Sequence, residues 1–208
     1  MAIECPPNDE FIPQNEYKVE DFIPTTKEHF DHMFKIMLLG DSGVGKTSIV
    51  TRFMKGDMHD NIATMTGGIE FKHVIFDVTD EGSDVKCAVK LQLWDSAGQP
   101  RFRELAKTHC RNKQAFLLFY DVTERTSFEN IDMWMTELRE VVKSPLVYLV
   151  ANKCDCDADK RAVTMSEGKM LATKIGTLFF ETSAQTGTGV ALLFQTLAKS
   201  LINNMEKT

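Results

Sequence analysis

The sequence predicts an α/β fold, in which a mostly parallel six-stranded sheet with one antiparallel edge strand carries helices on both faces. Fully apolar runs alternate with runs whose apolar residues recur at helical spacing, a pattern typical of parallel sheets buried on both sides. Two strand-like runs, 70–78 and 85–95, are separated only by the turn-like DEGSD, which predicts a hairpin and therefore the antiparallel edge. The 208 residues suit a single domain, and no run approaches the roughly 18 apolar residues of a membrane span.

The remaining elements follow in order along the chain. Apolar runs predict buried strands at 33–40, 114–122, 145–153 and 177–184. Helical spacing predicts helices at 46–54, 127–142, 166–176 and 190–205. Gly176 is expected to end the third of these helices because glycine adopts the left-handed conformation of helix ends.

Residues 1–32 are predicted to form an acidic, proline-rich N-terminal extension, and residues 33–205 the folded domain. The first 31 residues hold two bases, Lys18 and Lys27, against eight acids: Glu4, Asp9, Glu10, Glu16, Glu20, Asp21, Glu28 and Asp31. The whole chain has 24 bases and 30 acids, so the body is electrically neutral, and we expect no nucleic-acid partner. Several aromatic residues of the extension are expected to pack onto the body or onto a partner. The capping-box spacing of residues 25–28 predicts a short helix running towards Met33.

The start of the chain lacks the basic flank and apolar run of a signal peptide, and its five cysteines are scattered. These features predict a cytoplasmic protein with reduced thiols.

The segment Gly40–Thr47 matches the phosphate-binding pattern G-x-x-x-x-G-K-[ST] and lies between a predicted strand and a predicted helix. Its glycines let the backbone wrap around phosphates, and Lys46 is expected to reach the β- and γ-phosphates. The hydroxyl of Thr47 is expected to ligate Mg²⁺. The motif alone does not distinguish kinases, ATPases and GTPases.

Two further motifs follow apolar strands. Asp95, in DSAG, is placed to hold Mg²⁺ through water, and Gly98 can bring its N–H close to a γ-phosphate. In Asn152-Lys153-Cys154-Asp155, the carboxylate can accept both the N1–H and the 2-amino group of guanine. Adenine lacks this pair of donors, so the motif favours GTP over ATP.

The order GDSGVGKT, GGIEF, WDSAGQ, NKCD and TSAQTG resembles the Ras superfamily of small GTPases, and specifically its Rab branch. YDVT at 120–123 and SFENIDMW at 127–134 add to the resemblance, which covers roughly residues 33 to 205. It implies a small G domain with the P-loop NTPase fold. It also implies a Mg²⁺-dependent switch between GDP and GTP states that recruits effectors in vesicle trafficking.

The resemblance implies a role for individual residues of this sequence. Gln99 falls on the water-positioning glutamine, and the implied metal ligands are Thr47, Thr66 and Asp95. The implied nucleotide-binding residues are Asp41, Ser42, Gly43, Val44, Gly45, Lys46, Thr47, Ser48, Thr66, Gly98, Asn152, Lys153, Asp155, Ser183, Ala184 and Gln185. The implied partners are effector proteins, a GEF, and a GAP that supplies an arginine finger, with the chain itself a monomer.

The sequence departs from the family pattern in several places. The loop after Phe53 is one residue longer than usual, so Thr64 is the alternative to Thr66. Met58 replaces a common aromatic residue beside the guanine, which predicts faster GDP release. The segment KTHCRNKQA replaces a Tyr-rich part of the effector face, so partner identity does not transfer.

Pro100 stands where Rabs usually carry Glu. It biases Gln99 towards extended conformations, and any helix there is expected to start at or after Pro100. We therefore expect slow, GAP-dependent hydrolysis. The alternative function is that of a GTP-binding scaffold that has lost efficient hydrolysis. A third hypothesis is another P-loop enzyme such as a kinase, which the NKCD and SAQ motifs argue against.

The C-terminal LINNMEKT contains no cysteine to prenylate, so the chain as given encodes no membrane attachment. Peripheral association with endomembranes is then expected through a missing tail or through a partner.

Overall fold

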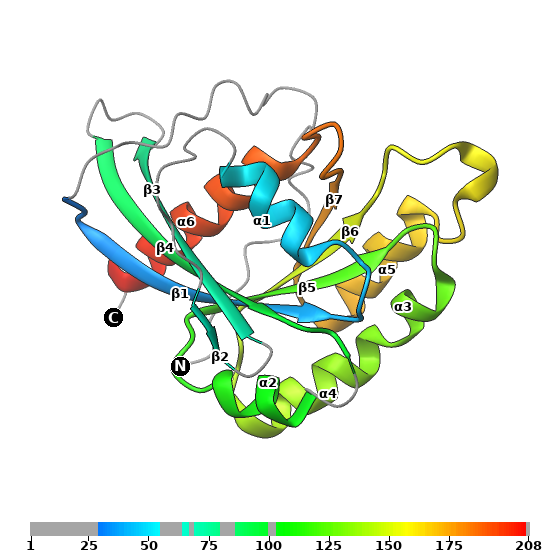
Figure 1. The fold of residues 1–208 in the computed structure, drawn as a ribbon, viewed down its shortest axis with the longest axis horizontal. Coiled ribbons are helices and arrows are strands. Elements are labelled where there is room, and N and C mark those ends of the chain that lie inside the picture. Colours follow the sequence, from blue (N-terminus) through cyan, green and yellow to red (C-terminus); the bar gives the residue numbers. More distant parts are fainter. Residues whose placement is uncertain (1–28, 55–63, 67–68, 80–85, 100–102, 207–208) are drawn as a thin grey trace.

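The computed structural model describes residues 29–54, 64–66, 69–79, 86–99 and 103–206. Seven strands form one sheet in the order β2-β3-β4-β1-β5-β6-β7 (Figure 1). Strands β2 and β3 run antiparallel to their neighbours, and all other pairs are parallel. The strands are β1 His32–Gly40, β2 Thr64–Thr66, β3 Ile69–Thr79, β4 Lys86–Ser96, β5 Ala115–Asp121, β6 Val147–Asn152 and β7 Leu178–Thr182.

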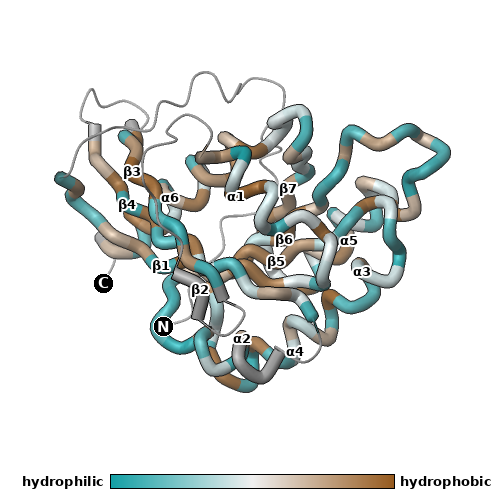
Figure 2. The backbone as a smooth tube through the Cα atoms, viewed as in Figure 1, coloured by the Kyte–Doolittle hydropathy of each residue, from teal (hydrophilic) through white to brown (hydrophobic). Residues whose placement is uncertain are grey.

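Helices cover the parallel strands on both sides, and along β1, β5 and β6 the side chains alternate between two cores. On β1, Ile36 and Leu38 pack with helices α1 and α6, whereas Met37 and Leu39 pack on the side of α2, α4 and α5. The hydropathy colouring shows β5 and β6 as mainly apolar and the connecting loops as largely polar (Figure 2). The helices are α1 Lys46–Met54, α2 Arg103–His109, α3 Arg125–Glu129, α4 Ile131–Val141, α5 Met165–Ile175 and α6 Val190–Glu206, with a 3₁₀ turn, η3, at Ala158–Lys160.

The predicted fold class is confirmed, with one addition at the edge of the sheet. The six predicted strands are present, and the three-residue strand β2 extends the antiparallel edge by pairing Thr66 with Ile69. Sequence patterning did not indicate β2 because a three-residue strand is too short to show alternation. None of the described helices is long and apolar enough to cross a membrane.

Two helix predictions need correction. The expected short helix does not reach Met33, because strand β1 already begins at His32. The single helix expected at 127–142 is two helices, α3 and α4, that meet at Asn130. The break lets the side chains of Asn130 and Trp134 donate to one carboxylate, that of Asp41. Helix α5 ends as predicted at Gly176, which has a φ of 72°.

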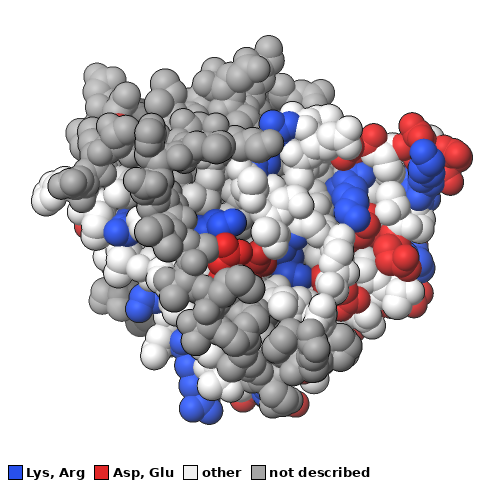
Figure 3. All heavy atoms as spheres, in the orientation of Figure 1, with Lys and Arg blue, Asp and Glu red and all other residues white. Residues whose placement is uncertain are grey.

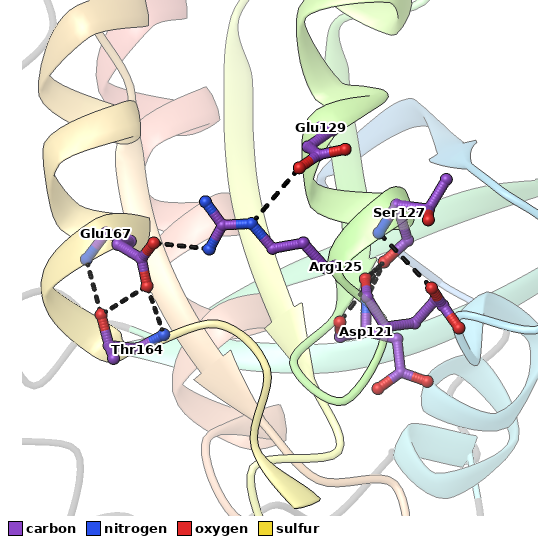
Figure 4. Close-up of polar contacts among 8 residues, drawn as sticks. Asp121, Arg125, Ser127, Glu129, Thr164 and Glu167 are labelled. Carbon is purple, nitrogen blue, oxygen red and sulfur yellow. Dashed lines mark hydrogen bonds and ion pairs between the residues drawn. The ribbon is translucent and has the colours of Figure 1, made fainter.

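Helix α5 begins with a capping box that also ties it to helix α3 (Figure 4). Thr164 accepts a hydrogen bond from the backbone of Glu167, and the Glu167 carboxylate accepts from the Thr164 backbone at 2.9 Å. Arg125 of α3 donates to the same carboxylate at 2.5 Å. The hydrogen bond from Arg125, followed by those from Thr164, lowers the pKa of Glu167 to about 2.

Replacing Glu167 with Gln is expected to destabilise the protein in a pH-dependent way. The folded-state pKa of Glu167 lies below the ordinary glutamate value of about 4.3, so the contribution of the carboxylate to stability is complete above that value and is lost as pH falls towards 2. The difference in unfolding free energy between wild type and Glu167→Gln, measured by urea denaturation, should therefore be constant above about pH 5.5 and shrink below the unfolded pKa of about 4.3.

Glu129→Gln is the matched control because Glu129 pairs with the same Arg125 at 3.4 Å across one exposed helical turn. We expect little effect from it. If the difference in unfolding free energy between wild type and Glu167→Gln stayed constant down to about pH 3, it would contradict the lowered pKa of Glu167.

Candidate functional site

The loop between β1 and α1 has the backbone of a phosphate-binding loop. Gly40, Gly43 and Gly45 have φ values of 131°, 85° and 96°, which side-chain-bearing residues rarely adopt. A Cβ atom on Gly45 would lie 2.2 Å from Nδ2 of Asn152, so this position also has no room for a side chain. The predicted loop is therefore formed, and at its tightest point it contacts Asn152.

Lys46 is buried at the start of α1 and its ammonium group folds back over the loop. It donates hydrogen bonds to the carbonyl oxygens of Gly40 at 2.8 Å and Asp41 at 2.7 Å. Burial lowers the pKa of Lys46 to about 8, against attraction from the carboxylates of Asp95 and Asp41. A buried cation held by carbonyl groups at the mouth of a glycine loop is suited to receive an anion.

Thr47 and Asp95 meet where the resemblance implies a metal. The hydroxyl of Thr47 donates to Oδ2 of Asp95. The other carboxylate oxygen, Oδ1, is buried and has no hydrogen-bond partner among the described residues. Burial raises the pKa of Asp95, while the Thr47 hydrogen bond and the charge of Lys46 oppose that rise. An orphaned buried carboxylate oxygen beside a threonine hydroxyl fits a hard cation such as Mg²⁺ or the water that it carries.

Asn152 connects the motif at 152–155, which is expected to select guanine, to the phosphate loop. It is buried, its amide donates to the carbonyl of Val44 at 2.8 Å, and its own oxygen accepts from Thr182 at 3.3 Å. The end of β6 is therefore attached to the loop that follows β1.

Two other residues of this motif, Lys153 and Asp155, line a cavity beside the phosphate loop. Lys153 has a φ of 65°, and its ammonium group pairs with the buried Asp121 at 2.5 Å, which holds the aliphatic stem in place. Asp155 is exposed. A cavity of about 490 Å³ is lined by Gly45, Thr47, Ser48, Thr51, Arg52, Asn152, Lys153, Asp155, Ala184 and Gln185. Residues predicted from three separate motifs thus share one cavity.

Arg52 is part of this site, although no motif indicated it. From helix α1 it donates to the carbonyl of Ala184 at 2.8 Å and also to the carbonyl of Gln185. Ser183 is buried, and its hydroxyl accepts from the backbone of Thr186 at 3.0 Å. The loop after β7 is therefore fixed from both sides, by Arg52 and by its own turn.

Asp41 was expected only to contribute to the phosphate loop, but in the structure its side chain also has a second role. Its carboxylate accepts hydrogen bonds from Asn130 at 2.6 Å and from the Trp134 indole at 2.9 Å. These contacts attach the phosphate loop to helix α4, which no sequence pattern suggested.

Gly98 lies directly against the phosphate loop. A Cβ atom there would be 2.3 Å from the carbonyl oxygen of Gly40 and 2.3 Å from the carbonyl carbon of Asp41, so only glycine fits. Gln99 follows as an exposed residue whose backbone N–H donates to Ala97 at 2.7 Å. Pro100 lies outside the described residues, and helix α2 begins after it, at Arg103.

Thr66, the expected third metal ligand, is not brought to Thr47 and Asp95. The register pairs Thr66 with Ile69, and Ile69 with Ser96, the neighbour of Asp95. Two strand spacings therefore separate Thr66 from the strand of Asp95, about 10 Å. Thr64 lies in the same strand, and the side chains of both lie outside the described residues, as does Met58.

Comparisons with known proteins agree with this geometry. The Ras family profile matches residues 35–203, which is most of the chain. The chain belongs to the Ras family. It is 41% identical over 199 residues to the Ras-related protein Rab-26 of Mus musculus, an alignment that covers 95% of this chain and 72% of the relative.

Two other Rab proteins align at a similar level. Rab-37 of Homo sapiens is 41% identical over 86% of this chain and 77% of its own length. Rab-13 of Canis lupus familiaris is 41% identical over 83% of this chain and 82% of its own length. The chain spans a smaller share, 66%, of the human Rab-26. The predicted family is confirmed: this is a divergent Rab-family small GTPase, a GTP-binding switch of the kind that acts in membrane trafficking.

Arg52→Ala is expected to speed GDP release from this Rab-family protein. Hydrogen bonds from a charged donor are worth roughly 1.5 kcal/mol, so the loss should raise the dissociation rate about tenfold. Release of a fluorescent GDP analogue, followed by stopped flow, measures this directly.

Arg139→Ala serves as the control, because Arg139 also donates from a helix to a backbone carbonyl, that of Ile175 at 3.3 Å. It is not among the residues that line the cavity, and it should leave GDP release unchanged. Equal release rates in the two variants would show that Arg52 does not shape the site.

Proposed function

We propose that this Rab-family chain binds GTP across the cavity between α1 and the ends of β6 and β7, and hydrolyses it slowly. The observation that carries the proposal is the hydrogen bond from Asn152 to the Val44 carbonyl. It holds the motif that selects guanine against the loop that takes phosphates, so one nucleotide can contact both.

We assign the phosphates to the loop from Asp41 to Ser48, with Lys46 at the β- and γ-phosphates. The buried position of Lys46 supports this assignment, because an incoming phosphate would replace carbonyl contacts with a charge-assisted bond. Asp155 is assigned to the guanine N1–H and 2-amino groups, with the Lys153 stem along the base. Ser183, Ala184 and Gln185 complete the base site, and their loop is held by Arg52.

Thr47 and Asp95 are proposed to hold Mg²⁺, Asp95 through water. The bound ion would neutralise charge on the β- and γ-phosphates. The unpartnered Oδ1 of Asp95 supports this role, since a buried carboxylate oxygen needs a cation or a donor.

Thr66 is proposed as the third ligand in the GTP state only. It would have to leave its pairing with Ile69 to approach Asp95. A three-residue edge strand has few backbone hydrogen bonds to lose, so this change is inexpensive. Such a rearrangement is the kind of loop change by which GTPases show different surfaces in their two states.

Gln99 is proposed to position the attacking water. It is exposed and directly follows Gly98, which is packed against the phosphate loop. No arginine of the nucleotide-binding motifs is assigned to the γ-phosphate, so a GAP would supply that charge. The protein is proposed to act as a monomer, in the cytoplasm and peripherally on endomembranes, with effectors, a GEF and a GAP as partners.

Single-turnover GTP hydrolysis tests the catalytic proposal. Gln99→Leu should slow the reaction roughly tenfold by removing the group that orients water. Pro100→Glu should accelerate it about threefold, because proline disfavours the helical backbone conformation at the preceding residue. The control Gln195→Leu changes a residue of helix α6 and should match wild type. Equal, negligible rates in wild type and Gln99→Leu would instead indicate a scaffold that only holds GTP.

The titration of Lys46 predicts how nucleotide affinity depends on pH. Its pKa of about 8 in the folded, nucleotide-free protein means that the ammonium form is depleted as pH rises through that value. Phosphate binding requires the charged form, so GDP affinity should fall about fourfold between pH 7 and 8.5.

Equilibrium titration with a fluorescent GDP analogue in Mg²⁺-free buffer measures the effect. Lys46→Arg should bind more weakly but without this slope, because the guanidinium stays protonated. A similar decline in both proteins would exclude Lys46 as its source.

A further inference from the structure

On one side of the sheet, the antiparallel strands extend past the helices that cover the parallel strands. Val74, Phe76, Val89 and Leu91 point into the core beneath α1 and α6. The alternate positions point the other way, where α2, α4 and α5 cover mainly β1, β5 and β6. These alternate residues, with Lys113, are called the open sheet face: Lys35, Phe71, His73, Ile75, Lys90, Gln92, Trp94 and Lys113. Only Trp94 among them packs against the second core.

Positive charge dominates the open sheet face. It carries three cations, Lys35, Lys90 and Lys113, beside His73, and Asp77 lies near its end. Burial, followed by the charge of Lys35, lowers the pKa of Lys113, and burial together with Lys90 lowers that of His73. The cations therefore repel one another. Within the described part of the chain, the three lysines form no ion pair with a carboxylate.

The same face also presents aromatic surface. Phe71 stacks on Trp94 with ring centroids 5.3 Å apart, and the Lys113 ammonium lies 3.9 Å from the centroid of the Trp94 ring. The side chains of Phe71, Ile75 and Trp94 are only half-buried. A cationic surface with aromatic residues fits an acidic segment that also carries aromatic side chains.

The N-terminal extension of this chain has that composition. Residues 1–28 carry two bases and seven acids: Glu4, Asp9, Glu10, Glu16, Glu20, Asp21 and Glu28. The phenylalanine and tyrosine residues within 1–28 are Phe11, Tyr17 and Phe22.

The extension joins the fold at one end of the open sheet face. The ring of Phe30 lies 4.9 Å from the ammonium of Lys90. Asp31 bonds to Ala88 of β4 twice, through its backbone N–H and its carboxylate, each at 2.8 Å. From Ala88 to Trp94 along β4 is about 20 Å, which six or so residues of extended chain can span. The acids at 20, 21 and 28 are therefore near enough to reach the lysines.

We propose that residues 1–28 bind across the open sheet face of their own chain, pairing their carboxylates with Lys35, Lys90 and Lys113. The segment then competes with protein partners that dock on this face. Only this competition rests on the proposed switch function; the binding itself does not.

The distribution of charge over the surface is compatible with this pairing. In the view of Figure 3, most of the acidic side chains drawn lie at the end of the molecule that carries η3, α3 and α5. Some acids of that end have basic partners, as in the pairs Lys160–Asp157 at 2.5 Å and Lys174–Asp132 at 3.1 Å.

Zero-length cross-linking of the full chain tests the proposal. A carbodiimide joins a carboxylate to a lysine ammonium as an amide, with loss of water, only where the two groups touch. We expect peptides that link residues 1–28 to Lys35, Lys90 or Lys113 at a yield about fivefold above links to the exposed Lys143 and Lys169. Their yield should fall at least threefold from about 0.05 M to 0.5 M salt, because screening weakens exposed ion pairs. The Lys174–Asp132 pair provides an internal positive control.

Cross-linking a mixture of ¹⁴N- and ¹⁵N-labelled chains distinguishes binding of the segment within one chain from binding between two copies. Links within one isotope support binding within the chain, whereas mixed-isotope links would replace this proposal with a second copy of the chain. Links distributed evenly over all lysines, or none to the open sheet face, would overturn it.

Tryptophan fluorescence gives a second measurement. The chain has two tryptophans; Trp134 is 3% exposed and Trp94 is half-buried, so acrylamide reports mainly on Trp94. Glu16→Gln/Glu20→Gln/Asp21→Asn should increase quenching about twofold by releasing the segment. The control Asp157→Asn/Asp159→Asn should not, and unchanged quenching in the triple variant would overturn the proposal. Neither experiment uses a nucleotide, so failure here leaves the hydrolysis tests unaffected.

Discussion

The site depends most on the hydrogen bond from the Asn152 amide to the Val44 carbonyl. It joins the ends of two strands, β1 and β6, that are separated by β5 in the sheet. Because Asn152 is buried and Gly45 lies against it, the phosphate loop cannot shift without disturbing the guanine motif. In the proposed binding mode, selection of the base and binding of the phosphates share one rigid element.

Around this link, charged side chains are held in place by polar contacts, which for Asp41 and Asp121 come from elements distant in the sequence. Lys46 is held by two backbone carbonyls, Asp41 by two donors of the α3–α4 segment, and Asp121 by Lys153. Each contact offsets the cost of removing a charge from water. Lys46, Asp41 and Asp121 are consequently held in fixed positions, so the part of the site that they form is preorganised.

The sequence predicted the sheet and most of the helices because their signals are local. Gly176 ended α5 as expected, since a left-handed residue is a property of a few neighbouring positions. Failures occurred where a distant contact mattered. The pattern at 127–142 is a continuous helical one, yet the chain breaks at Asn130, where the side chain donates to Asp41, 89 residues away. The edge strand that contains Thr66 is a separate case: its pairing with β3 is a long-range feature that no motif encodes.

By itself, the sequence determined the family, the phosphate loop and the preference for guanine, because each depends on which residue types stand at fixed short spacings. Only the tertiary structure decided that Arg52 holds the loop of Ala184, that Trp134 and Asn130 hold Asp41, and that lysines from β1, β4 and the segment before β5 share one face. Strand order and register bring these residues together. Both follow from burying the two cores at once, which is a property of the whole chain and not of any local segment.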